Sequence, residues 1–161
     1  METLTVRRAA LPDLAELDAL CAASYPRLLA KDYPPSLRVT AIPVLARAQP
    51  GLIGSGRYFV AEDADGAIRG AGGWSGRPGA KAAEVRHLFT DWRMTRRGIA
   101  RTVMGHVFAD ARKAGFGRIG CHATRTAVPF YVALGFRPEG EVVVPLLPGI
   151  GFPVVRMDRT L

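Results

Sequence analysis

The residues with the clearest chemical potential lie in segment 84–101, where the pattern predicts a strand, a tight turn and then a helix. The first amide groups of a helix lack acceptors within the helix, and the aligned peptide dipoles place partial positive charge there. Gly98 has no side chain, so an anion can approach the backbone of the turn. The turn is also surrounded by four guanidinium groups, those of Arg93, Arg96, Arg97 and Arg101. This combination predicts a site for a pyrophosphate.

The same residues have a second interpretation, in which Gly98 is an ordinary turn glycine and the arginines form a solvated face. The segment has neither the GxxxxGK[ST] pattern of a P-loop nor the GxGxxG pattern of a Rossmann dinucleotide site. The choice between the two interpretations therefore depends on the elements around the turn.

Hydrophobic periodicity predicts those elements. Strands are expected at residues 4–8, 57–61, 67–74, 84–90, 118–123, 141–147 and 152–157, and helices at 12–21, 36–45, 97–114 and 127–134. Ser36 is expected to cap the second helix, and the prolines of residues 25–35 predict a loop before it. No repeat or linker divides this order, so we expect a single α/β or α+β domain, residues 1–161.

Composition limits the class of protein. Apolar residues make up 48% and charged residues 22% of the 161 residues, which is typical of a globular domain with a sizeable core. The only cysteines, Cys21 and Cys121, lack metal-ligand spacing, so we expect reduced thiols in the cytoplasm and no metal site. No apolar run reaches the roughly 18 residues of a membrane span, and no signal peptide is recognisable. The net charge of +8 favours a polyanionic partner, either nucleic acid or a small molecule with several phosphates.

Two motifs resemble those of the GNAT-type (GCN5-related) N-acetyltransferases. Residues 95–100, Thr-Arg-Arg-Gly-Ile-Ala, resemble the [Q/R]xxGx[G/A] acyl-CoA motif, with Thr95 where Gln or Arg is usual. Residues 127–136, Ala-Val-Pro-Phe-Tyr-Val-Ala-Leu-Gly-Phe, resemble the Axx[FL]YxxxGF segment of the family's last helix, and Thr124 stands where Asn is common. The two motifs occur in the family's order on the expected elements, and the resemblance spans essentially the whole chain.

The resemblance implies a mixed, mostly antiparallel central sheet of six or seven strands flanked by about four helices. It also implies acetyl-CoA as co-substrate, with a pyrophosphate held by Arg96, Arg97, Gly98, Ile99, Ala100 and Arg101. The pantetheine arm is then expected along the motif strand, bonded to the main chain near Phe89 and Thr90. The implied reaction is direct acetyl transfer in a ternary complex to a primary amine of a small molecule or a protein.

The resemblance also implies catalytic roles. Tyr131 matches the family's catalytic tyrosine and is expected to protonate the leaving thiolate, although it can also be a packed tyrosine at the edge of the core. Glu84 lies eleven residues before Thr95, where some members carry a glutamate, and is the leading general base. Its structural alternative is a solvated charge paired with Arg86. His87 and His122 are rival bases because an unperturbed imidazole titrates near neutral pH.

The same residues also bear on alternative functions and on the binding partners of the protein. A non-catalytic acyl-CoA-binding sensor on this fold is the main alternative, because Thr95 and Thr124 depart from the motifs. Covalent catalysis by Cys121 is disfavoured since no partner is assured to form its thiolate. Scattered arginines without a nucleic-acid motif make nucleic acid an unexpected partner, and no membrane partner is expected.

The acceptor is expected to bind near residues 20–55, the loop between the last two strands, and Trp74, where few acids argue against a polycationic acceptor. Tyr25, Tyr33 and Phe152 are further candidates for lining the acceptor pocket. A homodimer is also considered, through the apolar strands 142–147 and 152–155, which can equally be internal.

Overall fold

The chain folds around one seven-stranded sheet in a computed structural model that describes residues 3–76 and 81–161. The strands are β1 Thr5–Arg8, β2 Tyr58–Glu62, β3 Ile68–Gly76, β4 Ala82–Thr90, β5 Arg118–Ala123, β6 Arg137–Leu147 and β7 Ile150–Thr160. They lie in the order β1-β2-β3-β4-β5-β7-β6, and neighbours are antiparallel except for β4 and β5. The expected mixed, mostly antiparallel sheet is confirmed.

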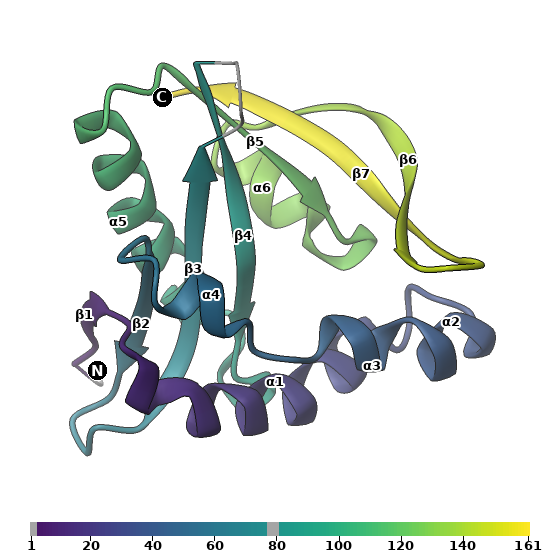
Figure 1. Cartoon of the computed structure of the whole chain (residues 1–161), viewed down its shortest axis with the longest axis horizontal. Helices are drawn as coiled ribbons and strands as arrows, with labels where there is room; N and C mark the ends of the chain where they lie inside the picture. The colour runs from purple at the N-terminus through teal and green to yellow at the C-terminus, as the bar shows by residue number, and fades with distance from the viewer. Residues whose placement is uncertain (1–2, 77–80) are drawn as a thin grey trace.

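The helices cover both faces of this sheet (Figure 1). They are α1 Leu14–Leu29, α2 Pro35–Thr40, α3 Ile42–Leu45, α4 Pro50–Ile53, α5 Ile99–Lys113 and α6 Val128–Ala133, with short 3-10 turns η1 Leu11–Asp13, η2 Trp92–Met94 and η3 Arg125–Ala127. Along β2, Phe59 and Ala61 pack with α5 and α6, whereas Val60 between them packs with α1 and α3. This alternation is the two-residue period of a strand with a hydrophobic core on each face.

The first helical region differs from the prediction. Helix α1 continues to Leu29 although it contains Pro26, so the loop expected from residue 25 is wrong for its first turn. Tyr25 and Leu29 are buried on the core face of α1, and their burial offsets the hydrogen bond that a proline cannot donate.

The second predicted helix is divided into α2 and α3 at Ala41, and α4 occupies part of an expected connection. Pro34, and not Ser36, is the N-cap of α2, with Pro35 as its first residue. These short segments explain why the described chain has more helices than the four expected.

Strands β4 and β5 form the feature that positions the candidate site. They pair only from Ala82–Glu84 to Arg118–Gly120 and then separate, which Figure 1 shows as β5 leaning away from β4. Beyond this contact, no strand among the described residues pairs with the side of β4 that would face β5. A gap therefore opens within the sheet.

The two C-terminal strands pair with each other along almost their whole length. Phe152 and Val154 are buried in the core, so β7 is internal to the sheet, whereas β6 forms its edge. Val142, Val143 and Leu147 are exposed on β6. Among the described residues, no helix combines the length and apolar character needed to cross a bilayer.

Candidate active site

The turn between β4 and α5 is open to solvent. Gly98 is the N-cap of α5 with φ of 78°, and Arg96 before it has φ of 61°, so two left-handed residues reverse the chain here. The first helical bond runs from the Thr102 N–H to the Gly98 carbonyl, at 3.0 Å. The N–H groups of Ile99, Ala100 and Arg101 therefore have no acceptor within the helix.

The surroundings of this turn fit an anion. Arg96, Arg97, Gly98 and Arg101 are exposed, and a side chain added at Gly98 would meet nothing within 4 Å. The exposed amides, the helix dipole and the guanidinium groups all favour negative charge at the same place. The predicted pyrophosphate site is thus accessible and electrostatically suited to its ligand.

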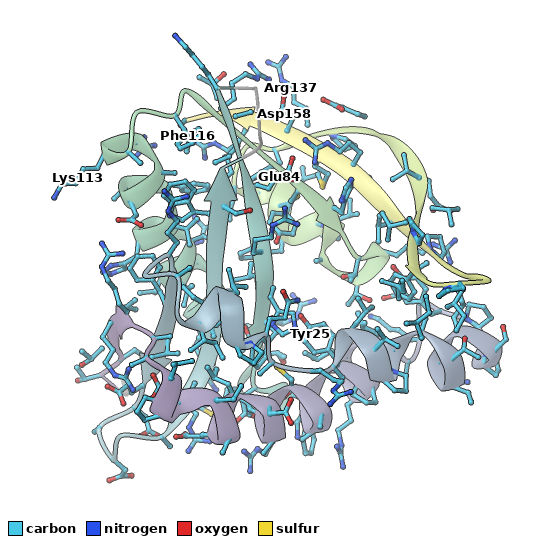
Figure 2. The ribbon with its side chains drawn as sticks, viewed as in Figure 1. Tyr25, Glu84, Lys113, Phe116, Arg137 and Asp158 are labelled. Atoms are coloured by element: carbon cyan, nitrogen blue, oxygen red, sulfur yellow. The ribbon has the colours of Figure 1, made fainter. Side chains whose placement is uncertain are left out.

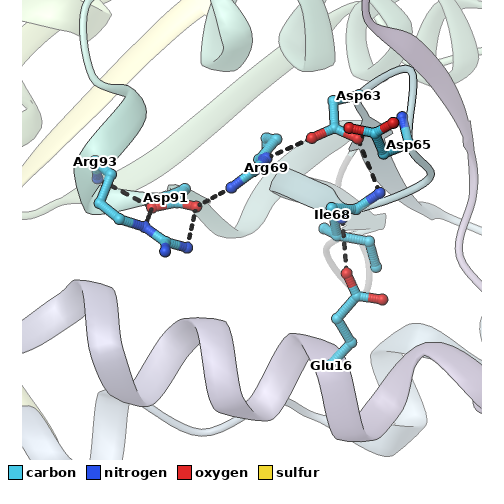
Figure 3. Close-up of polar contacts among 8 residues, drawn as sticks. Glu16, Asp63, Asp65, Ile68, Arg69, Asp91 and Arg93 are labelled. Atoms are coloured by element: carbon cyan, nitrogen blue, oxygen red, sulfur yellow. Dashed lines mark hydrogen bonds and ion pairs between the residues drawn. The ribbon is translucent and has the colours of Figure 1, made fainter.

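Asp91 fixes the end of β4 just before this turn (Figure 3). Its side chain is fully buried and accepts bonds from the Arg93 N–H and Nε, both at 3.0 Å, and from Arg93 Nη2 at 2.9 Å. It also accepts from Arg69 Nη1 at 3.1 Å, and Arg69 Nε binds Asp63 at 2.8 Å. The guanidinium of Arg93 is therefore directed to Asp91, and not to the anion site as its sequence position suggested.

Asp91 makes acid sensitivity a testable property of the fold. Burial raises the pKa of the Asp91 carboxyl, but the bonds from Arg93 and Arg69 outweigh it and the net pKa is below the usual value. A carboxyl whose pKa is lower in the folded state stabilises the fold above its unfolded pKa, near 4. This stability is lost as the pH falls through the folded-state value.

Replacing Asp91 with asparagine is therefore expected to lower the free energy of unfolding at pH 7 by about 2 kcal/mol, because charged hydrogen bonds are lost. The variant should also lose less stability than the wild type between pH 5 and pH 3. Urea unfolding at both pH values measures this, with the exposed turn residue Asp65 changed to asparagine as control. An unchanged pH dependence in the Asp91 variant would contradict the assignment.

The backbone of β4 presents Thr90 to the gap. The Asp91 N–H donates to the Arg69 carbonyl at 2.8 Å, and Phe89 is opposite Ala71 in the same antiparallel pair. Because backbone groups alternate in direction along a strand, the groups of Phe89 point to β3 and those of Thr90 point away from β3. The expectation for Phe89 needs correction: its amide belongs to the β3 ladder, and its side chain is buried beside Tyr25.

His87 is held within the protein and is not placed as a base. It lies at an irregularity in the β3–β4 pairing with φ of 49°. Its Nε2 is 3.0 Å from the Leu45 carbonyl, which can only accept, so Nε2 carries the proton. The Tyr58 hydroxyl donates to the His87 carbonyl at 2.8 Å, and the Tyr25 ring stacks on the imidazole. Burial lowers the pKa of His87, so its imidazole is neutral. Its hydrogen bond to Leu45 connects the irregular part of β4 to α3.

Tyr131 lies on α6, within the core between the sheet and helices α5 and α6. Its ring is buried, with edge-on contacts to Phe130 at 5.3 Å and Phe136 at 5.1 Å. Burial raises the pKa of Tyr131 well above its ordinary value, with smaller contributions from Cys121 and from Tyr25 of the opposite face. Burial also raises the pKa of Tyr25. Both phenols carry their protons at neutral pH, as an unperturbed phenol also does.

Glu84 lies where β4 and β5 begin to separate, as Figure 2 shows. Its nearly buried carboxylate receives two bonds from one guanidinium, Oε1 from Arg156 Nη2 at 2.8 Å and Oε2 from Nη1 at 2.9 Å. Arg156 reaches it from β7 across Gly120 of β5, where any side chain would overlap the guanidinium. The structural alternative, a solvated charge paired with Arg86, does not describe this carboxylate, which is nearly buried and paired with Arg156. Arg86 Nε donates to the Ser75 hydroxyl at 2.7 Å.

The other candidate side chains, those of His122, Cys121 and Trp74, differ in their exposure and contacts. His122 is exposed, whereas Cys121 is buried and burial raises the pKa of its thiol to about 12. A thiol of this kind is not a nucleophile at neutral pH. Trp74 does not line an acceptor pocket, since its Nε1 donates to Asp110 of α5 at 2.9 Å.

Tyr33 and Phe152 join the segment between α1 and α2 to the C-terminal hairpin. Their rings stack at 4.4 Å, and the Tyr33 hydroxyl donates to the Pro153 carbonyl and accepts from the Arg125 N–H, both at 2.9 Å. Of the proposed acceptor-site aromatic residues, Tyr25 is the one that contributes to the raised pKa of Tyr131. Sequence reasoning missed Asp91 and Arg156. Arg156 has no local signal, because its partner Glu84 is 72 residues away. Asp91 has one, since an aspartate two residues before Arg93 can cap the turn that follows β4, whereas its bond to Arg69 depends on the pairing of β3 and β4.

Comparison of the sequence with known protein families identifies the family of this chain. Residues 44–160 match the profile described as an acetyltransferase (GNAT) domain, which covers most of the chain. The chain belongs to the GNAT acetyltransferase family. No curated protein sequence matches it significantly.

Solved structures of GNAT proteins share the fold over the whole chain. A GCN5-related N-acetyltransferase from Rhodopseudomonas palustris is 21% identical with a TM-score of 0.85, covering 100% of this chain and 98% of that chain. The PaiA N-acetyltransferase of Thermoplasma acidophilum, solved with coenzyme A, is 17% identical with a TM-score of 0.73 and covers 99% of both chains. A phosphinothricin acetyltransferase from Sinorhizobium meliloti, solved with acetyl-CoA, is 21% identical with a TM-score of 0.67, covering 99% of this chain and 89% of that chain.

Proposed function

We propose that this GNAT protein is an acetyl-CoA-dependent N-acetyltransferase that acts on a primary amine by direct transfer. The observation that carries the proposal is the gap between β4 and β5. Strand β4 lines the gap with the Thr90 backbone and leads to the open amides at the start of α5. The phenol of Tyr131, from α6, is proposed to lie at the same gap as the proton donor. A thioester, its pyrophosphate and a proton donor can thus be held by one continuous surface.

The co-substrate is assigned to the residues of this surface. The pyrophosphate is proposed to bind the amides of Gly98, Ile99, Ala100 and Arg101 and the guanidinium groups of Arg96, Arg97 and Arg101. The pantetheine arm is proposed to bond to Thr90 along β4. Two of the neighbours described above hold coenzyme A or acetyl-CoA, which supports this co-substrate.

The transfer needs few chemical groups once both substrates are held side by side. The amine nitrogen forms a bond to the thioester carbon, and the bond from that carbon to sulfur breaks. Tyr131 gives its proton to the leaving thiolate, and the proton of the amine passes to a base. The Tyr131 phenol carries its proton at neutral pH, as an unperturbed phenol also does.

Glu84 is proposed as that base, acting through water. It is the carboxylate at the point where β4 and β5 separate, and its ion pair with Arg156 has to loosen when it takes a proton. His122, exposed on β5, is the second candidate base. His87 is less suited, because its Nε2–H donates to the Leu45 carbonyl and burial lowers its pKa.

Binding and turnover test the proposal separately. Coenzyme A at a hundred times its dissociation constant is expected to add about 2.7 kcal/mol of stability, which a thermal-shift assay detects. Acetyl-CoA with a panel of primary amines should then release free thiol. Binding without turnover of any amine would identify an acyl-CoA sensor, and no binding at all would remove the transferase assignment.

A further inference from the structure

The face of the sheet opposite α5 and α6 carries an unusual set of charged groups. On β5, Ile119, Cys121 and Ala123 pack against the helices α5 and α6, so Gly120 and His122 between them face the other side. Arg156 of β7 is opposite His122 and bonds to Glu84 across Gly120, which places these residues on that same side. Any acceptor that approaches the gap from this side meets these groups.

Arg156 has hydrogen-bonding capacity left on this face. Its bonds to Glu84 run from Nη1 and Nη2, which uses one hydrogen on each nitrogen. A guanidinium has five N–H donors, so Nε–H and the second hydrogen of Nη2 form a further fork that matches a carboxylate. Within the part of the chain that the structure describes, this fork has no protein acceptor, and the side chain keeps 16% of its surface exposed.

The neighbouring charges favour an anion beside that fork. Arg86 is two residues from Glu84 on the same face of β4, about 7 Å along the strand, and is exposed. Its Nε donates to the Ser75 hydroxyl at 2.7 Å, and this bond does not use the N–H groups of its terminal nitrogens. Two nearby acids form ion pairs, Glu84 with Arg156 and Asp158 with Arg118. Glu139 adds a weaker electrostatic attraction to Arg118 and to Arg156.

We propose that the acceptor of this enzyme is an amine that also carries a carboxylate, as an amino acid does. The outer fork of Arg156, with Arg86 beside it, binds the carboxylate while the amine nitrogen faces the gap between β4 and β5. This inference rests on the proposed transferase function and adds the chemical class of the acceptor. Glu84 then has a positioning role as well, because its two bonds hold the guanidinium of Arg156 flat over Gly120.

The wild-type enzyme tests the substrate class directly. Thiol release from acetyl-CoA is measured with glutamate, methionine and phenylalanine and with the α-carboxamide of each, which keeps the amine and removes the charge. At least one acid is expected to have a kcat/KM about 10- to 100-fold above that of its amide, because bonds to a charged group are lost in the amide. Equal or faster turnover of all three amides overturns the proposal.

Two variants test the role of Arg156. Arg156→Lys keeps the charge but lacks the fork, and Gly120→Ala displaces the guanidinium without changing any charge. Each is expected to reduce the preference for the acid to less than a third of the wild-type ratio while the affinity for coenzyme A is retained. Arg118→Lys, on the same face but paired with Asp158, is the matched control and should keep the preference. A preference that persists in both test variants overturns the assignment.

Product binding separates the failure of this inference from that of the transferase function. Calorimetry of the protein loaded with coenzyme A, titrated with the three N-acetylated acids and their N-acetylated amides, needs no turnover. Tighter binding of an acid by at least tenfold supports the carboxylate site even if no amine is acetylated, in which case only the transferase function fails. Equal affinities for acids and amides overturn the carboxylate site, whatever the turnover.

Discussion

The Tyr131→Phe enzyme is expected to have a kcat at least about 100-fold below that of the wild type, with the dissociation constant for coenzyme A changed less than about twofold. A positioned general acid contributes roughly two to four orders of magnitude to a rate. The substitution removes only the hydroxyl, and the ring contacts with Phe130 and Phe136 are retained. The leaving thiolate would then depart without its proton donor.

Steady-state thiol release and calorimetry measure the two quantities. Tyr33→Phe is the matched control, because it removes a phenol hydroxyl whose bonds go to Pro153 and Arg125 and not to the gap. This control is expected to lose about 1 to 3 kcal/mol of stability and to keep its kcat. Near-normal turnover in Tyr131→Phe would assign that residue to packing alone.

Gly98→Asp is expected to raise the dissociation constant for coenzyme A by about 100-fold. The space beside Gly98 is open, and the residue is left-handed, a conformation that aspartate tolerates better than most residues. The new carboxylate would lie next to the free amides of α5 and repel the pyrophosphate there. The loss should diminish as salt is added, because salt screens exposed charges.

Two variants separate charge from backbone strain. Gly98→Asn has nearly the same shape without the charge, and its affinity is expected to fall at least tenfold less than that of Gly98→Asp. Gly115→Asp, at the other end of the same helix, places aspartate at another left-handed glycine with open space, and it should leave binding unchanged. An equal loss of affinity in the aspartate and asparagine variants of Gly98 would show that strain, and not charge, weakens binding.

The local sequence was enough to predict most elements and the order in which they occur. Residues 118–123 were predicted as a strand and are β5, and the helix expected at 97–114 is α5. Such elements are predictable because the spacing of apolar residues within one short segment indicates a helix or a strand. The helix through Pro26 was not predictable in this way, since only the burial of Tyr25 and Leu29 outweighs the proline.

The candidate site also has a part that the local sequence predicts and a part that depends on tertiary contacts. The sequence by itself determined the turn that we propose for the pyrophosphate, because Gly98, its arginines and the start of a helix are adjacent in the chain. Only the tertiary structure decided that Glu84 pairs with Arg156 and that the backbone groups of Phe89 point to β3. Ion pairs between strands and the direction of a backbone group depend on pairing register across the sheet, and register is set by contacts between residues far apart in the sequence.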